Sequence, residues 1–314
     1  MKITVADSQA GVRLDRLVVD AVPGIGRAGA KRLFADGKVR VATAEGERPR
    51  RAAKGDVATA GAVVEIEIEE GASDAALPDA GVSLEVVLET PEVVVVDKPA
   101  GLPTAPLSPG EKGTLANGLV ARYPELAGIG FSAREPGLVH RLDTDTSGLV
   151  VAARTAEAFE VLKTALKEGR LDKRYLLVCD AHDLPETGTI EVPLAPHPKD
   201  RRRVYPCVHP RDIARYAPRP ATTTYAKLRQ TDRWALVEAR APKAARHQLR
   251  AHFAAIGHPL AGDALYGGPE VAGLTRHALH AHHVGWSGDA RVPAFTVRSP
   301  LPPDLAALVG EPEG

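Results

Sequence analysis

The chain has 314 residues, enough for one large catalytic domain and one small accessory domain. Hydrophobic residues make up 44% and charged residues 25%, and no apolar run approaches the roughly 18 residues that cross a bilayer, which excludes a membrane-spanning protein. The two cysteines, Cys179 and Cys207, stand far apart and outside any C-x-x-C pattern, which argues against a disulfide framework or a zinc ribbon. The first residues lack the apolar run of a signal peptide, so we expect a cytoplasmic protein.

The 40 basic and 40 acidic residues cancel, which by itself argues against a general nucleic-acid binder. The average conceals a basic stretch over residues 27–54, where nine lysines and arginines face three acidic residues. A charge run of this kind is usually a solvated surface. Its meaning therefore depends on the elements around it.

Residues 12–41 predict two short amphipathic helices followed by a strand. Apolar residues recur at helical spacing twice, at Leu14, Leu17 and Val18 and again at Ala30, Leu33 and Phe34. Gly37 suits a left-handed helix end before a strand over 38–41. The alternating run 63–68 indicates a closing strand with one polar face.

This pattern resembles, over residues 11–69, the small RNA-binding domain named after the fourth protein of the small ribosomal subunit. In that domain a basic helix and the strand after it grip folded RNA. The resemblance assigns phosphate contacts to Gly24, Arg27, Lys31, Arg32, Lys38 and Arg40. Such contacts give affinity but little sequence information. We therefore expect a small α/β RNA-binding domain, here called the S-four-like domain, over residues 1–70.

Residues 71–84 are small, acidic and turn-prone, so we predict an interdomain linker there and one catalytic domain over 85–314. The β-branched run 93–96 indicates a buried strand. The loop D-K-P-A-G-L at 97–102 follows, which is either a simple strand exit or part of a site. A helix over 155–168 ending at Gly169 is the clearest helical element. The clearest strands cover 173–179, 222–229 and 234–240.

The most informative segment is G-L-V-H-R-L-D-T-D-T-S-G-L-V-V at 137–151. It places Asp143 two residues after Arg141 in a loop that leads into a β-branched run, and loops at strand ends commonly carry chemistry. A single loop aspartate is more often a cap or a turn residue. The segment 140–148 as a whole resembles the H-R-L-D-x-x-T-S-G signature of RluA-type pseudouridine synthases at all seven fixed positions.

Two further segments resemble the same family. L-D-K-R-Y-L at 171–176 resembles its K-x-Y strand, and R-H-Q-L-R-A-H at 246–252, with G-H-P-L-A-G-D-A-L-Y-G at 257–267, resembles its later elements. A helix over 246–256 would place Arg246 and Arg250 together at i,i+4, so that Arg250 points at a neighbouring carboxylate. The sequence departs from the family at 244–245, where Ala-Ala replaces the common Gly-Arg. A backbone turn or phosphate contact made there is thereby in question.

The resemblance implies conversion of uridine to pseudouridine in structured RNA, ribosomal or transfer. The reaction breaks the N-glycosidic bond and rejoins the uracil through carbon 5, so it loses no group and needs no cofactor. Asp143 would be the essential carboxylate, acting as nucleophile or base, with Arg250 as its cationic partner. Tyr175 would stack on the extruded base and Arg141 would fill the vacated stack. His140 and Thr146 would complete the substrate-binding set.

The expected fold class is α+β: a large mixed, mainly antiparallel sheet with flanking helices, preceded by the small α/β domain. The histidine run H-A-L-H-A-H-H at 277–283 matches no zinc spacing, so we expect no metal. We also expect a monomer that binds RNA and no membrane.

Two rival classes remain. A non-catalytic RNA-binding protein of this fold would be favoured by loss of Asp143, Tyr175 or Arg250, and all three are present. A hydrolase using Asp143 would need a metal set or a paired carboxylate, and Asp145 lies too close in the chain to be a clear partner. The target RNA and its uridine positions do not follow from the sequence.

Overall fold

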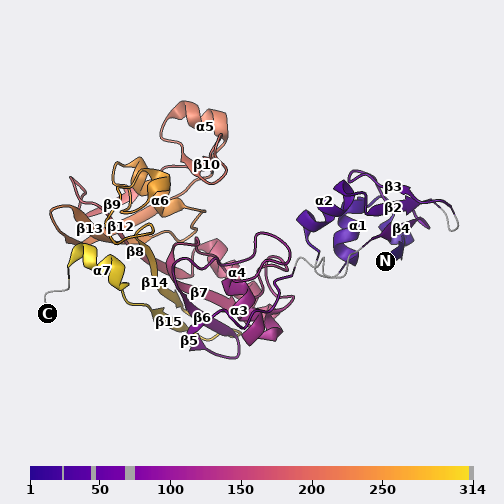
Figure 1. Cartoon of the computed structure of the whole chain (residues 1–314), viewed down its shortest axis with the longest axis horizontal. Helices are drawn as coiled ribbons and strands as arrows, with labels where there is room; N and C mark the ends of the chain where they lie inside the picture. Colours follow the sequence, from indigo (N-terminus) through magenta and orange to yellow (C-terminus); the bar gives the residue numbers. More distant parts are fainter. Residues whose placement is uncertain (23–24, 44–46, 68–74, 311–314) are drawn as a thin grey trace. The chain divides into compact units, whose positions relative to one another are not determined.

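The computed structural model describes residues 1–22, 25–43, 47–67 and 75–310 (Figure 1). Contacts divide the chain into two units, one comprising Met1–Val82 and Ala105–Gly137 and the other Ser83–Thr104 and Leu138–Gly314. The predicted domain limits at residues 70 and 85 stay predictions. Gly24 and part of the predicted linker, 71–74, lie outside the described residues.

The amino-terminal residues form a four-stranded antiparallel sheet in the order β1-β4-β2-β3, with two helices. Its elements are β1 (Lys2–Thr4), α1 (Leu14–Ala21), α2 (Arg27–Ala35), β2 (Val39–Ala42), β3 (Arg50–Arg51) and β4 (Val63–Ile66), with a short 3-10 turn η1 (Asp7–Gln9). The six predicted apolar helix positions all belong to one buried cluster with the sheet residues Val39, Val64 and Ile66. Gly37 has φ +71°, the left-handed conformation predicted after α2.

The segment Ala105–Gly137 contains α3 (Leu115–Arg122) and the 3-10 turn η2 (Pro124–Leu126). Thr114 caps α3, because its hydroxyl accepts a hydrogen bond from the Asn117 amide. The buried Asn117 side chain also donates to the Leu77 carbonyl at 2.7 Å, which ties the segment to the residues before β5 (Glu85–Glu89).

The second unit is built on a nine-stranded sheet in the order β5-β6-β7-β14-β8-β13-β12-β9, with β15 paired to β14. Its further strands are β6 (Val93–Lys98), β7 (Ser147–Ala153), β8 (Asp172–Asp180), β9 (Thr187–Ile190), β12 (Thr223–Gln230), β13 (Trp234–Arg240), β14 (Leu279–Trp286) and β15 (Phe295–Arg298). Only β7 and β14 run parallel among these described pairs. The sheet is therefore mixed and mainly antiparallel, as predicted.

Helices α4 (Ala156–Glu168), α6 (Gln248–Ala255) and α7 (Pro303–Val309) accompany this sheet, with the 3-10 turn η3 (Ala264–Tyr266) after α6. Helix α4 begins after the cap residue Thr155 and ends at Gly169, which has φ +79° as the sequence predicts. A small separate hairpin of β10 (Leu194–Pro196) and β11 (Val204–Pro206) leads to α5 (Pro210–Tyr216). No helix in the described part of the chain is both long and apolar enough to cross a membrane.

Helix α6 corrects one prediction, because it begins at Gln248 and not at Arg246. His247 adopts a left-handed conformation with φ 55°, which no helix continues through, and the Gln248 side chain accepts the Ala245 N–H at 2.8 Å. The expected pairing of Arg246 and Arg250 on one helix face is therefore wrong. Leu249 and Phe253 do face inward, into one buried cluster with Tyr175 of β8.

Candidate active site

The loop that carries Asp143 is fixed through its backbone. The Lys98 side chain is fully buried, and its ammonium donates hydrogen bonds to the carbonyls of Pro99, Leu102 and Thr144 at 2.8–2.9 Å. The Thr104 hydroxyl donates to the Leu142 carbonyl at 2.6 Å. Burial lowers the pKa of Lys98 to about 8, so it is still mostly charged at neutral pH. The D-K-P-A-G-L segment therefore holds the loop at residues 142–144 in position through these hydrogen bonds.

The Ser-Gly end of the motif has a steric explanation. Gly148 pairs with Ala281 where β7 runs beside β14, and it has φ +114°. A side-chain carbon at this position would lie 2.3 Å from the Ala281 carbonyl oxygen, so only glycine fits between the strands. This close approach brings the loop before β7 beside the residues that precede β14.

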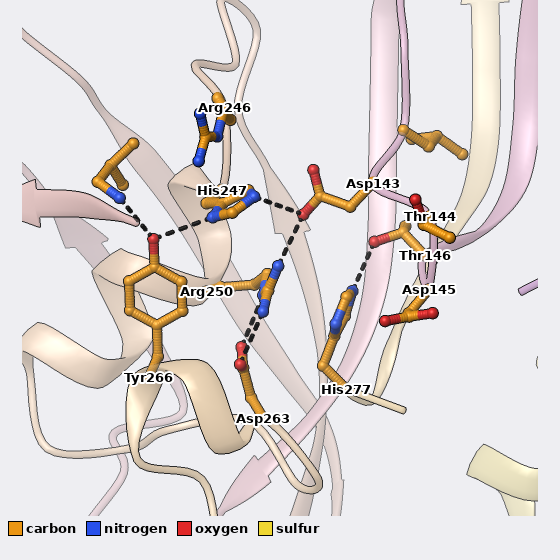
Figure 2. Close-up of polar contacts among 12 residues, drawn as sticks. Asp143, Thr144, Asp145, Thr146, Arg246, His247, Arg250, Asp263, Tyr266 and His277 are labelled. Carbon is orange, nitrogen blue, oxygen red and sulfur yellow. Dashed lines mark hydrogen bonds and ion pairs between the residues drawn. The ribbon is translucent and has the colours of Figure 1, made fainter. Parts of the chain in front are cut away.

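Asp143 is bound to Arg250, as Figure 2 shows. The Arg250 Nη1 lies 3.0 Å from Asp143 Oδ2, while its Nε and Nη2 donate to the two carboxylate oxygens of Asp263 at 2.7 and 2.8 Å. The side chain of Asp263 is 1% exposed, that of Arg250 8% and that of Asp143 26%. The buried carboxylate therefore orients the guanidinium in a bidentate contact, and the guanidinium holds the more exposed carboxylate.

His247 and Tyr266 complete this arrangement. His247 Nε2 lies 3.6 Å from Asp143 Oδ2, and His247 Nδ1 lies 3.1 Å from the Tyr266 hydroxyl. Burial lowers the pKa of His247, against the opposing effect of the Asp143 charge. The Arg250 guanidinium also lies 5.2 Å from the centre of the Tyr266 ring. His247 has a left-handed backbone conformation, and its imidazole lies toward Asp143. The residue before α6 thus contributes a side chain to the site.

The two oxygens of Asp143 are in different surroundings (Figure 2). Oδ2 faces both Arg250 and His247, whereas Oδ1 has no hydrogen-bond or ion-pair partner among the residues that the structure describes. A carboxylate held at one oxygen by a cation and open at the other can act as a nucleophile or as a base. The geometry leaves both roles available.

Tyr175 lies on the face of β8 that bears α6 and is 6% exposed. Burial, together with the nearby charge of Asp143, raises the pKa of its phenol, so the ring is neutral. Arg141, by contrast, is exposed two residues before Asp143. The predicted stacking roles of both residues stay predictions.

Thr146 and His140 face the protein interior. Thr146 is 2% exposed and its hydroxyl lies 2.7 Å from His277 Nε2, a contact that supports the loop. His140 Nε2 accepts the Val151 N–H at 3.3 Å, and burial lowers the pKa of His140 to about 3. Both contacts link the loop to neighbouring strands. The substrate contacts predicted for these two residues stay predictions beside these internal contacts.

The predicted phosphate-binding residues lie on α2 and β2. Lys31, Arg32 and Arg40 are exposed, Lys38 is half-buried, and the side chain of Arg27 lies outside the described part of the chain. An exposed basic helix followed by a basic strand suits contact with phosphates. Their role stays a prediction.

The histidine run is divided among separate partners. His277 contacts Thr146, His280 contacts Ser147, and His282 and His283 contact Glu238 and Asp172. Within the described residues no group of three or more histidine, cysteine or acidic side chains is placed to hold a metal ion. The expected absence of a metal stays a prediction.

Sequence reasoning missed three site residues and misplaced one. His247, Asp263 and Tyr266 stood in the matched segments without a role. Asp263 lies 13 residues after Arg250 in the matched segments, and that position was the available signal for it. Its burial, which requires a cationic partner, is seen only in the structure. Arg246, which the sequence placed beside Arg250 on one helix, is exposed and donates to the Arg201 carbonyl at 2.8 Å.

Comparison with known proteins shows the family of the chain. The family model described as RNA pseudouridylate synthase matches residues 92–255, which include the Asp143 loop and α6. The chain therefore belongs to the RNA pseudouridylate synthase family, and within it to the RluA type. It is an isomerase that acts on RNA.

Its relatives match nearly the whole chain. Ribosomal large subunit pseudouridine synthase D of Yersinia pestis is 30% identical over 322 residues, covering 98% of this chain and 93% of that protein. The same-named protein of Xanthomonas campestris pv. campestris is 32% identical, covering 97% and 90%. A protein of Chloroflexus aurantiacus, called "Uncharacterized RNA pseudouridine synthase", is 36% identical, covering 98% and 92%.

Solved structures confirm the predicted fold class. Human RNA Pseudouridylate Synthase Domain Containing 1 superposes with a TM-score of 0.56 at 25% identity, covering 74% of this chain and 90% of that one. Human RNA Pseudouridylate Synthase Domain Containing 4 gives 0.54 at 21% identity, covering 71% and 90%, and shows the fold alone.

Proposed function

We propose that this enzyme converts specific uridines of large-subunit ribosomal RNA to pseudouridine, with Asp143 as its essential carboxylate and without a cofactor. The observation that carries the proposal is the asymmetric environment of Asp143: Arg250 binds Oδ2, while Oδ1 has no partner within the described ranges of the chain. The choice of ribosomal RNA rests on the relatives named ribosomal large subunit pseudouridine synthase D, which match 97–98% of this chain.

The residues around Asp143 divide the work of the reaction. Unstacking the target uridine costs a few kcal/mol, and stacking of the base on the Tyr175 ring offsets on the order of 1–3 kcal/mol of that free energy. Arg141, exposed beside the loop, fills the vacated position. Asp143 Oδ1 then meets the sugar or the base, while Arg250 keeps the carboxylate ionised and oriented.

Atoms balance without a cofactor, because the bond broken at N1 of the uracil is replaced by one at C5 and the proton lost from C5 returns to a ring nitrogen. Asp143, Arg250 and Asp263 come from one chain, which supports a monomer as the acting form. The S-four-like domain supplies phosphate contacts through Arg27, Lys31, Arg32, Lys38 and Arg40. A ribosomal RNA substrate places the enzyme in the cytoplasm.

The test is Asp143→Asn, with the neighbouring exposed carboxylate as a matched control in Asp145→Asn. Asp143→Asn is expected to fold and bind RNA, because Arg250 keeps its contact with Asp263, but to form no pseudouridine in unmodified large-subunit ribosomal RNA. Asp145→Asn is expected to retain activity. Turnover by purified Asp143→Asn above a mock preparation contradicts the assignment.

The substrate is tested separately by mapping pseudouridines in ribosomal and transfer RNA from cells with and without the gene. Loss of sites in large-subunit ribosomal RNA supports the proposal. Loss confined to transfer RNA refutes the choice of substrate but leaves the Asp143 chemistry intact.

A further inference from the structure

Arg250 binds Asp143 through only one of its nitrogens. Its Nη1 lies 3.0 Å from Asp143 Oδ2, whereas its Nε and Nη2 both donate to Asp263, at 2.7 and 2.8 Å. One hydrogen bond leaves a carboxylate free to turn about the bond that joins it to its side chain, because that torsion is soft. A reaction at one particular oxygen of Asp143 therefore needs a second contact that fixes the plane of the carboxylate.

His247 is placed to supply this second contact, as Figure 2 shows. Its Nε2 faces the same oxygen, Asp143 Oδ2, at 3.6 Å, and its side chain is 12% exposed. It approaches from the left-handed turn before α6, whereas Arg250 comes from within the helix. A distance of 3.6 Å is longer than a hydrogen bond, and catalytic contacts of this kind commonly shorten when substrate binds. Two donors can then meet at one carboxylate oxygen.

The position of the hydrogen on the His247 ring determines whether this contact attracts or repels. Burial lowers the pKa of His247, so the ring is neutral at pH 7 and carries a single N–H. With that hydrogen on Nδ1, the lone pair of Nε2 would face the negative charge of Asp143. With the hydrogen on Nε2, the ring donates toward the carboxylate and Nδ1 becomes an acceptor.

Tyr266 decides between the two forms of the ring. Its hydroxyl lies 3.1 Å from His247 Nδ1, and its oxygen accepts the Val204 N–H at 2.8 Å. Because a backbone N–H already occupies one lone pair of this oxygen, the hydroxyl hydrogen is available to Nδ1. Tyr266 is 7% exposed, and the guanidinium groups of Arg203 and Arg250 lie 5.3 and 5.2 Å from its ring centre. A fixed donor to Nδ1 favours the form of His247 that carries its hydrogen on Nε2.

We propose that His247 is a positioning residue for the reaction, which holds Asp143 Oδ2 through its Nε2–H while Tyr266 keeps the hydrogen on Nε2. The proposal rests on the proposed function, because it concerns the same carboxylate and the same reaction. Arg250 and His247 bind one oxygen from two directions, so that Oδ1 is the oxygen presented to the uridine. Both contacts also favour the ionised carboxylate.

A general base that takes the proton from C5 of the uracil is the competing role for His247. Both of its ring nitrogens, however, face partners within the described part of the chain, Nε2 facing Asp143 and Nδ1 facing Tyr266. Asp143 Oδ1 has no such partner there. The geometry therefore favours a residue that acts through Asp143 over one that touches the uridine.

The experiment compares His247→Gln with His247→Asn as a matched pair in the full-length protein. The amide nitrogen of glutamine stands as far from the backbone as histidine Nε2, so His247→Gln keeps a donor within reach of Asp143. The shorter asparagine reaches only the position of Nδ1, beside Tyr266. Asparagine tolerates the left-handed conformation at position 247 better than glutamine does, so a faster glutamine variant cannot be explained by the backbone.

Three quantities are measured for each variant: the single-turnover rate of pseudouridine formation at saturating enzyme, the Kd for an unmodified transcript of large-subunit ribosomal RNA, and stability in urea. His247→Asn is expected to lose on the order of 10- to 100-fold in rate with an unchanged Kd, because a donor to a charged group is removed. His247→Gln is expected to be at least about tenfold faster than His247→Asn. Equal losses in the two variants overturn the proposal, since both remove a base but only one removes the donor. A wild-type rate in His247→Asn overturns it as well.

A second measurement reads the form of the ring directly and needs no RNA. Nuclear magnetic resonance of protein with isotope-labelled histidine distinguishes hydrogen on Nε2 from hydrogen on Nδ1, and the His247 signals are those that His247→Gln lacks. Wild type is expected to carry hydrogen on Nε2 at neutral pH, and Tyr266→Phe, which removes the donor to Nδ1, is expected to give a mixture and a lower rate. Hydrogen on Nδ1 in wild type overturns the proposal whatever the rates. A wild type that binds the transcript without forming pseudouridine refutes the proposed function instead, and the resonance measurement then still decides the form of His247.

Discussion

Arg250 lies between two carboxylates, so its removal should have separate effects on stability and on activity. In Arg250→Ala, the side chain of Asp263, 1% exposed, loses both of its bidentate contacts. Removing one partner of a buried ion pair typically costs about 3–5 kcal/mol, because the remaining charge is uncompensated. Asp143, 26% exposed, keeps access to water and should contribute little to that loss. We therefore expect Arg250→Ala to lose about 3–5 kcal/mol of unfolding free energy, nearly all of it through Asp263.

The double variant Arg250→Ala/Asp263→Asn separates the two effects. Neutralising Asp263 should restore most of the stability, since no buried charge is left unpaired. It should not restore activity, because Asp143 still lacks the cation that orients it. Arg250→Lys keeps the charge but not the planar fork that meets both carboxylates, so it should recover both properties in part.

Urea unfolding gives the stabilities, and single-turnover pseudouridine formation on one RNA at saturating enzyme gives the activities. A wild-type rate in Arg250→Ala would refute the pairing of Arg250 with Asp143 as a requirement for catalysis. Equal loss of activity and stability, both recovered in the double variant, would show that Arg250 acts only through folding.

Three further predictions follow from burial and charge. Deleting residues 1–70 should weaken RNA binding and flatten its salt dependence, by up to about one unit of slope per lost phosphate contact, and an unchanged slope in a binding titration would contradict the RNA-binding role. Lys173→Met should raise the unfolding free energy by about 1–3 kcal/mol at pH 7. The reason is that Lys173 is a buried cation: burial lowers its pKa to about 8, and its ammonium has no hydrogen-bond partner among the described residues. The gain should shrink as pH rises from 8 to about 10.4 in urea titrations, since only the unfolded lysine then stays protonated. Burial lowers the pKa of His277 to about 3, so the unfolding free energy of the wild type should fall as pH drops below about 6.5, because only the unfolded histidine then binds a proton. His277→Asn should reduce the slope of unfolding free energy against pH by the equivalent of one proton.

Much of the second unit could be predicted from local patterns. The strands at β8, β12 and β13 and the helix α4 lie within a residue or so of their predicted limits. These elements have β-branched or periodic apolar residues and clear ends, such as Gly169 with φ +79°. The start of α6 was wrong because the left-handed conformation of His247 depends on contacts with Asp143 and Tyr266, which are distant in sequence.

The site itself could be predicted only where a motif specified a role. Asp143 and Arg250 are 107 residues apart in sequence, and only the family pattern suggested their contact, which the structure shows at 3.0 Å. Thr146 belongs to the same motif, yet its hydroxyl contacts His277 across 131 residues. A fixed position in a motif therefore does not distinguish a residue that meets substrate from one that holds the loop. Thr146 is 2% exposed, and its contact with His277 holds the loop before β7.

The net charge of zero says little about whether the protein binds RNA, because electrostatic attraction to RNA acts over short distances. Charges on a protein surface are largely screened beyond about 10 Å at moderate salt, so acids elsewhere in the chain do not cancel a basic surface. The nine basic residues of 27–54, for example, stand in a segment with only three acids. A chain with no net charge can thus carry a strongly basic segment, as the predicted RNA-binding domain requires.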